Sequence, residues 1–102
     1  MGSFRVVFDW RAQQELMELY DYIHDESGAE RAASFTTEIR DYCLGFATFP
    51  ERGTLREDIA PGVRIVGFRK RVSIAFRISE EQVLILGIFY GGRNIQPGLL
   101  DD

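Results

Sequence analysis

The fold is decided by residues 72–90, VSIAFRISEEQVLILGIFY, in which apolar residues recur with the period of a β-strand. Positions 72, 74, 76 and 78 are apolar and alternate with Ser73, Ala75 and Arg77, a pattern typical of a strand with one buried face. Residues 79–82 are polar and predict a tight turn. Residues 83–90 are apolar on both faces, which predicts a central strand.

One short strand and two amphipathic helices are expected before this hairpin. Residues 4–8 are aromatic and β-branched, and Asp9 is placed to cap the helix that follows. Gly28 suits the end of that helix, and Ser27 and Glu30 have the spacing of a capping box for the next one. The apolar stripes are Leu16, Leu19, Tyr20 and Ile23 in the first helix and Ala32, Phe35, Ile39, Tyr42, Cys43 and Phe46 in the second.

The rest of the chain completes an α+β pattern. Pro50 ends the second helix, a loop is expected as far as Gly62, and residues 63–69 predict another strand. The order β-α-α-β-β-β places an antiparallel helical hairpin on one face of a twisted, mainly antiparallel sheet. We expect a single domain over residues 1–102, with a core at 4–93 and a tail at 94–102.

Length and composition narrow the class of protein. The chain has 102 residues and a single cysteine, Cys43, which cannot form an internal disulfide and fits a reducing compartment. No apolar run approaches the roughly 20 residues that span a bilayer, and Arg5 and Asp9 interrupt any signal-peptide core. A cytoplasmic protein without membrane contact is therefore expected.

Charge is unevenly distributed along the chain. Residues 1–63 carry six Arg and twelve Asp or Glu, whereas residues 64–93 carry five Arg and one Lys against two Glu. Proteins that grip nucleic acid by its backbone are usually far more basic than this chain, whose net charge is −4. An acidic peptide or protein surface suits the local basic region better than stable binding to DNA.

Residues suited to covalent or metal chemistry are scarce. The only histidine, His24, lies at the end of the first helix, and the only thiol, Cys43, lies on an apolar stripe. The sequence contains no HExxH, CxxC or EF-hand pattern and no glycine-rich phosphate loop. We expect no metal and no cofactor.

Three arginines stand out by their positions in the expected strands. Arg64, Arg77 and Arg93 lie in or just beyond three strands that should be neighbours. Arg77 alternates with the apolar face and so should point to the side that the helices leave uncovered. Guanidinium groups gathered there would form an anion-binding surface, although ordinary solvated strand charges remain the alternative.

Four phrases follow one another along residues 4–93: AQQELMELYDYI at 12–23, PERG at 50–53, GVR at 62–64 and ILGIFYGGR at 85–93. In this order they resemble the ParE/RelE toxin superfamily, and the long hairpin is more similar to the ParE family, which includes plasmid stabilisation proteins. The resemblance implies the toxin of a type II toxin–antitoxin system.

Two mechanisms follow from the resemblance. RelE-like members are ribosome-dependent mRNA endonucleases, which use basic residues on the sheet and often a Tyr or His shortly after the last-strand arginine. ParE-like members poison DNA gyrase without a known active site of their own. Arg93 matches the last-strand arginine, but residues 94–100 supply no acid or base, and arginine is always protonated near pH 7.

We therefore expect a gyrase poison that acts by binding and is neutralised by a ParD-like antitoxin. An mRNA endonuclease using Arg64, Arg77 and Arg93 is the first alternative, and an antitoxin-binding module without toxicity is the second. The expected antitoxin surface comprises apolar residues of the hairpin and the sheet arginines: Leu16, Leu19, Tyr20, Ile23, Phe35, Ile39, Arg64, Arg77 and Arg93.

Overall fold

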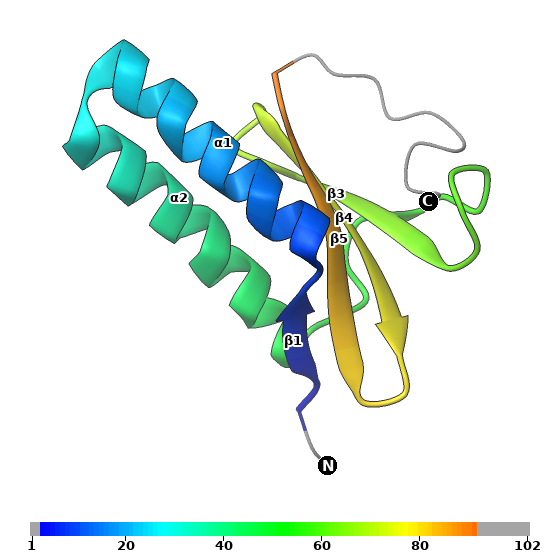
Figure 1. The fold of residues 1–102 in the computed structure, drawn as a ribbon. Coiled ribbons are helices and arrows are strands. Elements are labelled where there is room, and N and C mark those ends of the chain that lie inside the picture. Colours follow the sequence, from blue (N-terminus) through cyan, green and yellow to red (C-terminus); the bar gives the residue numbers. More distant parts are fainter. Residues whose placement is uncertain (1–2, 92–102) are drawn as a thin grey trace.

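A helical hairpin covers one face of a five-stranded sheet in the computed structural model, which describes residues 3–91 (Figure 1). The class is α+β, as the sequence predicts. The elements are β1 (Arg5–Phe8), α1 (Trp10–Ser27), α2 (Ala29–Leu44), the 3-10 turn η1 (Gly45–Ala47), β2 (Thr54–Leu55), β3 (Val63–Phe68), β4 (Val72–Ser79) and β5 (Gln82–Tyr90).

The strands are arranged in the order β1-β5-β4-β3-β2. β1 runs parallel to β5, and the other three pairs are antiparallel. Two details differ from the sequence prediction. β4 is the middle strand, with β5 beside it, and two residues of the expected loop, Thr54 and Leu55, form the edge strand β2.

Local signals at the helix ends explain the hairpin. The Asp9 carboxylate accepts a hydrogen bond from Arg11 N at 3.2 Å and caps α1, as predicted. Gly28 alone joins the two helices: its N–H donates to His24 O at 2.9 Å, and its carbonyl accepts from Ala32 N at 3.1 Å. Its φ of 95° is readily adopted only by glycine. The expected capping box is wrong, because Ser27 is still helical and no side chain within residues 3–91 caps α2.

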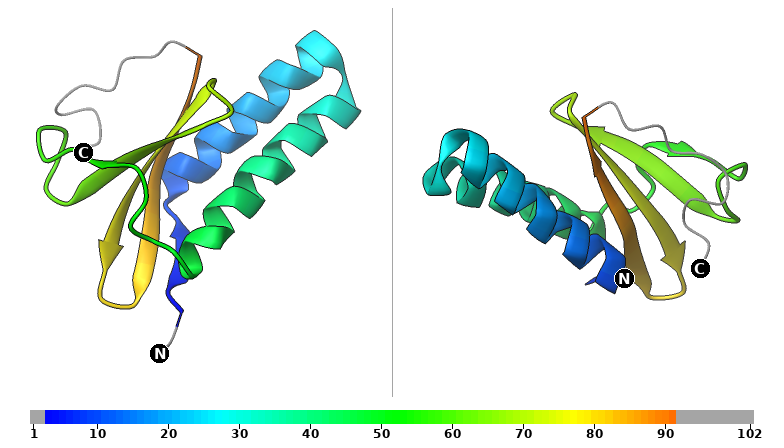
Figure 2. Two further views of the ribbon diagram at one scale, coloured as in Figure 1. Left: turned by 180° about the vertical axis from the view of Figure 1, so that it is seen from behind. Right: turned by 45° about the horizontal axis from the view of Figure 1, so that its top comes forward.

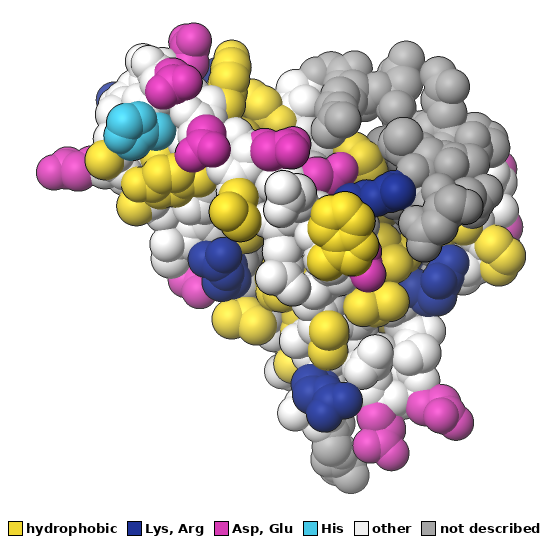
Figure 3. All heavy atoms as spheres, in the orientation of Figure 1, with side chains coloured by type: hydrophobic (Ala, Val, Ile, Leu, Met, Phe, Trp, Pro, Cys, Tyr) yellow, Lys and Arg dark blue, Asp and Glu magenta, His cyan; other side chains and the backbone are white. Residues whose placement is uncertain are grey.

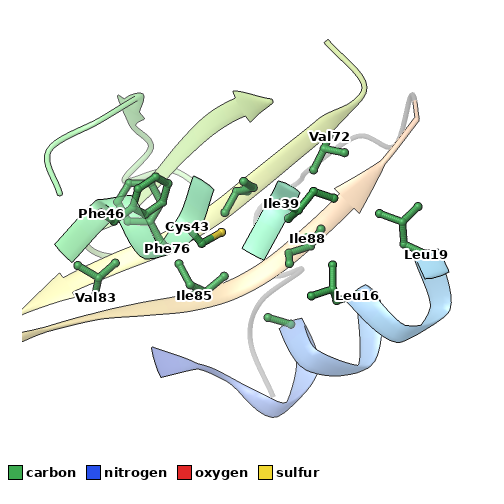
Figure 4. Packing of buried hydrophobic residues seen from close by; sticks show 12 residues of the cluster. Leu16, Leu19, Ile39, Cys43, Phe46, Val72, Phe76, Val83, Ile85 and Ile88 are labelled. Carbon is green, nitrogen blue, oxygen red and sulfur yellow. The ribbon is translucent and has the colours of Figure 1, made fainter. Parts of the chain in front are cut away.

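The main core lies between the hairpin and the sheet (Figure 4). Leu16 of α1 and Ile39 of α2 lie beside Ile88 of β5, and Phe46 of η1 packs against Phe76 with ring centroids 4.7 Å apart. Full burial of each such side chain contributes about 1.5–3 kcal/mol. The apolar stripes of both helices are thus used to hold the hairpin to the sheet.

A second, smaller core lies on the opposite face of the sheet. The loop between β2 and β3 places Ile59 and Ala60 against Val63, Ala75 and Phe89, all of which are buried. The sheet therefore has cover on parts of both faces, which explains why β5 is apolar on both sides. Figure 2 shows the β2–β3 connection on the side away from the helices.

A β-bulge shifts the alternation of β5. Ala75 pairs with Gly87 and Phe76 pairs with Ile85, so Leu86 is the extra residue of the bulge. As a result Ile85 and Ile88, three positions apart, both face the helices.

Within residues 3–91, neither helix combines the length and the apolar composition that a bilayer crossing requires.

Candidate binding site

The register of the sheet separates the arginines that the sequence suggests as one group. Arg64 of β3 pairs with Phe76, which belongs to the core under the helices. Arg77 of β4 pairs with Val63, which belongs to the core on the opposite face. Paired residues of antiparallel strands point to the same side, so Arg64 and Arg77 lie on opposite faces of the sheet. The expected single cluster is wrong for these two residues, and Arg93 lies outside the described residues.

Arg64 supports the corner formed by η1 and β2. Its Nη1 donates to the Arg52 carbonyl at 3.3 Å. The Arg52 guanidinium lies 5.5 Å from the Tyr42 ring centroid and 5.3 Å from that of Phe46. Gly53 has a φ of 70°, and a Cβ there would lie 2.2 Å from Ile65 O. These phrases of the sequence, PERG and GVR, therefore have a structural role at this corner.

Arg77 braces the loop over the second core. Its Nε donates to Pro61 O at 2.9 Å, and its side chain passes 3.7 Å from the position that a Cβ on Gly62 would take. The side chain is half-buried, on the face away from the helices as predicted. Its guanidinium is thus already used in holding the chain together.

The apolar residues suggested as an antitoxin surface divide into two groups. Leu16, Leu19 and Ile39 are at most 5% exposed and belong to the main core, so they are not available to a partner and the expectation is revised for them. They were misplaced because an apolar stripe at helical spacing equally describes the face that packs on the sheet. Tyr20, Ile23 and Phe35 are half-buried, and Ile23 and Phe35 border a groove.

This groove has a volume of about 680 Å³. Its lining comes from α1 and α2 near their connection, from the β3–β4 turn and from the end of β5. In this region the helical hairpin diverges from the sheet (Figures 1 and 2). Tyr22, Phe35 and Tyr90 form an aromatic wall: the Tyr22 and Tyr90 rings are 5.6 Å apart, and those of Phe35 and Tyr90 are 6.2 Å apart. Such a wall offers apolar area with polar hydroxyls at its edge.

Three arginines border the same groove: Arg31 of α2, and Arg69 and Arg71 of the β3–β4 turn. Arg71 Nη1 donates to the Tyr90 hydroxyl at 3.4 Å, and Arg69 Nη2 pairs with Glu38 Oε1 at 2.9 Å. Sequence reasoning missed these residues, although the run Arg69-Lys70-Arg71 is a visible signal. A surface of this kind can bind a partner that presents both carboxylates and apolar side chains.

Three side chains with a shifted pKa, Cys43, Arg56 and Asp58, lie outside the lining of the groove. Burial raises the pKa of the Cys43 thiol to about 12, so this cysteine is an inert core residue. Hydrogen bonding to Arg56 lowers the pKa of Asp58, but both side chains lie on the surface of the β2–β3 loop. Within residues 3–91 no three His, Cys, Asp or Glu side chains are grouped to hold a metal ion.

Comparisons with known proteins show which folds and families the chain is similar to. None of the curated proteins compared with the chain matches it. A solved structure of the chromosomal ParDE toxin–antitoxin system from P. aeruginosa is similar, with a TM-score of 0.76, 22% identity, and coverage of 87% of this chain and 97% of that one. The toxin–antitoxin complex RelBE2 from Mycobacterium tuberculosis is also similar, with a TM-score of 0.65, 19% identity, and coverage of 91% and 97%.

At these identities the solved structures establish the shared fold. A family model described as the ParE toxin of the type II toxin–antitoxin system parDE matches residues 6–95, which is most of the chain. The chain therefore belongs to the ParE toxin family of type II toxin–antitoxin systems.

Proposed function

We propose that this toxin inhibits DNA gyrase by binding it, and that a ParD-like antitoxin neutralises it. Membership of the ParE family supports a gyrase target. The observation that carries the binding mechanism is the separation of Arg64 and Arg77 on opposite faces of the sheet, because two such guanidinium groups cannot clamp one phosphate. Both side chains also hold backbone carbonyls of the protein itself.

The proposal of an antitoxin partner rests on the same family membership and on the surface of the groove. Two similar structures are described as a toxin–antitoxin system and a toxin–antitoxin complex, and the groove offers aromatic area beside arginines. A segment that is disordered when free can fold on such a surface, at a cost in ordering that its contacts must exceed. The complex would then block the toxin for as long as the antitoxin persists.

Expression of the toxin with and without its antitoxin tests the proposal. Toxin alone should arrest growth and raise DNA breaks, and a gyrase variant resistant to poisoning should remove both effects. Coexpressed antitoxin should restore growth. Growth arrest with intact DNA would reject gyrase as the target, and growth without arrest would favour a module that binds the antitoxin but lacks toxicity.

A RelE-like mRNA endonuclease is the second candidate, favoured by the fold shared with RelBE2. Primer extension on transcripts after induction separates it from the first. Cuts at fixed codon positions, dependent on translating ribosomes, would establish the nuclease. Transcripts without such cuts, in cells whose DNA is broken, would favour the gyrase poison over the nuclease.

A further inference from the structure

The backbone conformation of the turn between β3 and β4 is energetically unfavourable for the residues that adopt it. Arg69 and Lys70 have φ values of 54° and 60°, and Arg71 N closes the turn on Phe68 O at 3.3 Å. Two consecutive residues in the left-handed region are the pattern of a type I′ turn, for which Asn-Gly is strongly preferred. Within residues 3–91 these are the two non-glycine residues with positive φ.

A pair of residues so poorly suited to its backbone points to a use for the side chains. Strained backbone tends to occur at functional sites, where the surrounding structure maintains it. Closing the turn itself does not require these side chains, although Arg69 pairs with Glu38 and its guanidinium lies 5.6 Å from the Phe68 ring centroid. The turn instead projects a run of three cations, Arg69, Lys70 and Arg71, at the edge of the groove.

The charged residues that border the groove indicate the kind of ligand that it can bind. Arg31, Arg69 and Arg71 border it, together with Glu26 and Glu38. Glu38 already pairs with Arg69 in a solvent-exposed contact, which an incoming carboxylate could replace at little cost. By contrast, the outer surface of α1 is acidic, as Figure 3 shows, and repels such a group. The basic β3–β4 turn and the acidic surface of α1 together favour binding of an acidic segment at the turn.

We propose that the Arg69-Lys70-Arg71 turn is a docking site for carboxylates of a protein segment that lays apolar side chains on Tyr22, Phe35 and Tyr90. The left-handed backbone at Arg69 and Lys70 is unfavourable for residues with a side chain. The proposal rests on the proposed function, because the antitoxin is the partner that must recognise this toxin, and it assigns to the turn the selection of an acidic antitoxin segment.

A protein partner suits the site better than nucleic acid. The groove carries two carboxylates among three arginines, and the whole chain has a net charge of −4. Binding to a phosphate backbone gains mainly from counterion release by many cations, which this surface lacks. Apolar side chains, in contrast, gain from the aromatic wall regardless of net charge.

The test replaces the turn by the pair that its backbone prefers. The double variant Arg69→Asn/Lys70→Gly should raise Tm by roughly 4–8 °C because the left-handed strain is relieved. The same variant should weaken binding of a purified ParD-like antitoxin that neutralises this toxin by about tenfold or more, and should flatten the dependence of that binding on salt. These two opposite changes distinguish a docking turn from a merely structural one.

Two controls make the result specific. Arg69→Lys/Lys70→Arg keeps both charges and should keep the affinity within about twofold, whereas Arg40→Gln removes an exposed cation from α2, away from the groove, and should leave affinity unchanged. A 20-base-pair DNA duplex serves as the nucleic-acid probe.

Each outcome decides the proposal. Unchanged antitoxin affinity in the Asn-Gly variant overturns it, as does a loss of DNA binding with antitoxin binding intact. An equal loss in Arg40→Gln would show a general charge effect and would also overturn it. If wild-type toxin does not bind the antitoxin, the proposed function fails; if it binds and is neutralised but the turn variant behaves as wild type, only this inference fails.

Discussion

Glu15 Oε1 accepts a hydrogen bond from the backbone N–H of Ile88 at 2.8 Å, and this contact joins α1 to β5 next to the bulge. β1 ends at Phe8, opposite Ile85, so β5 continues past its parallel neighbour. Glu15 supplies an acceptor to this extension. Gly87 leaves room for it, because a Cβ there would lie 2.7 Å from Phe89 Cζ and 3.3 Å from Glu15 Oε1.

Removal of the Glu15 carboxylate should destabilise the fold. Ile88 is 2% exposed, so Glu15→Ala leaves its N–H without this acceptor and should cost about 1–3 kcal/mol of unfolding free energy. Glu15→Gln keeps an acceptor oxygen and should cost less. Chemical denaturation measures both, with Glu18→Ala on the exposed side of α1 as the control. Equal stability of the Glu15→Ala and Glu18→Ala variants would contradict the role of this contact.

Gly53 should tolerate no side chain. Its φ of 70° and the 2.2 Å that would separate an added Cβ from Ile65 O predict a loss of at least about 1–2 kcal/mol for Gly53→Ala. Gly67 lies in the adjacent strand β3, where a Cβ meets its nearest neighbour at 3.9 Å. Gly67→Ala should therefore be neutral or slightly stabilising. Thermal unfolding of the two variants provides the comparison, and similar Tm values for both would reject this account of the β2 corner.

Sequence patterns predicted most of the elements because their causes are local. Asp9 caps α1 through a contact two residues away, and the alternation around Ile74 requires only the period of a strand. β2 escaped prediction because two exposed residues, Thr54 and Leu55, carry no periodic signal. The bulge at Leu86 escaped for a similar reason, since a strand that is apolar on both faces shows no change of phase.

The site was harder to predict because it depends on register. Arg77 pairs with Val63 and not with Arg64, and a shift of one residue decides on which face a side chain lies. No local pattern contains that information. The groove is equally hard to predict from the sequence, because Tyr22, Phe35 and Tyr90 come from three different elements.

The thiol of Cys43 should be unreactive in the native protein. Burial raises its pKa from 9.0 to about 12, so the thiolate that attacks thiol reagents is essentially absent at pH 8. The unfolded chain ionises near pH 9, so this thiol's contribution to stability is complete below pH 9 and is lost as pH rises from 9 to 12. Labelling at pH 8 should require denaturant, and Cys43→Ala should reduce the fall of Tm above pH 9. Rapid labelling of folded protein would refute this.

Arg64 and Arg77 should act independently on any one partner. Because they lie on opposite faces, the effects of Arg64→Ala and Arg77→Ala on antitoxin affinity should add to within about 0.5 kcal/mol in the double variant. Calorimetric titration of the antitoxin into each variant measures the sum. A coupling of about 1 kcal/mol or more would instead indicate one shared site.

The proposed basis of toxicity is binding to gyrase and not cleavage of RNA. The most direct measurement titrates purified toxin against purified gyrase on supercoiled plasmid, in parallel with toxin added to ribosomes translating a defined mRNA. A gyrase poison should produce linearised plasmid that accumulates as toxin approaches the amount of gyrase, and should leave the mRNA intact. Antitoxin should reverse the accumulation. Catalytic amounts of toxin that cleave the mRNA, with the plasmid left intact, would contradict this proposal.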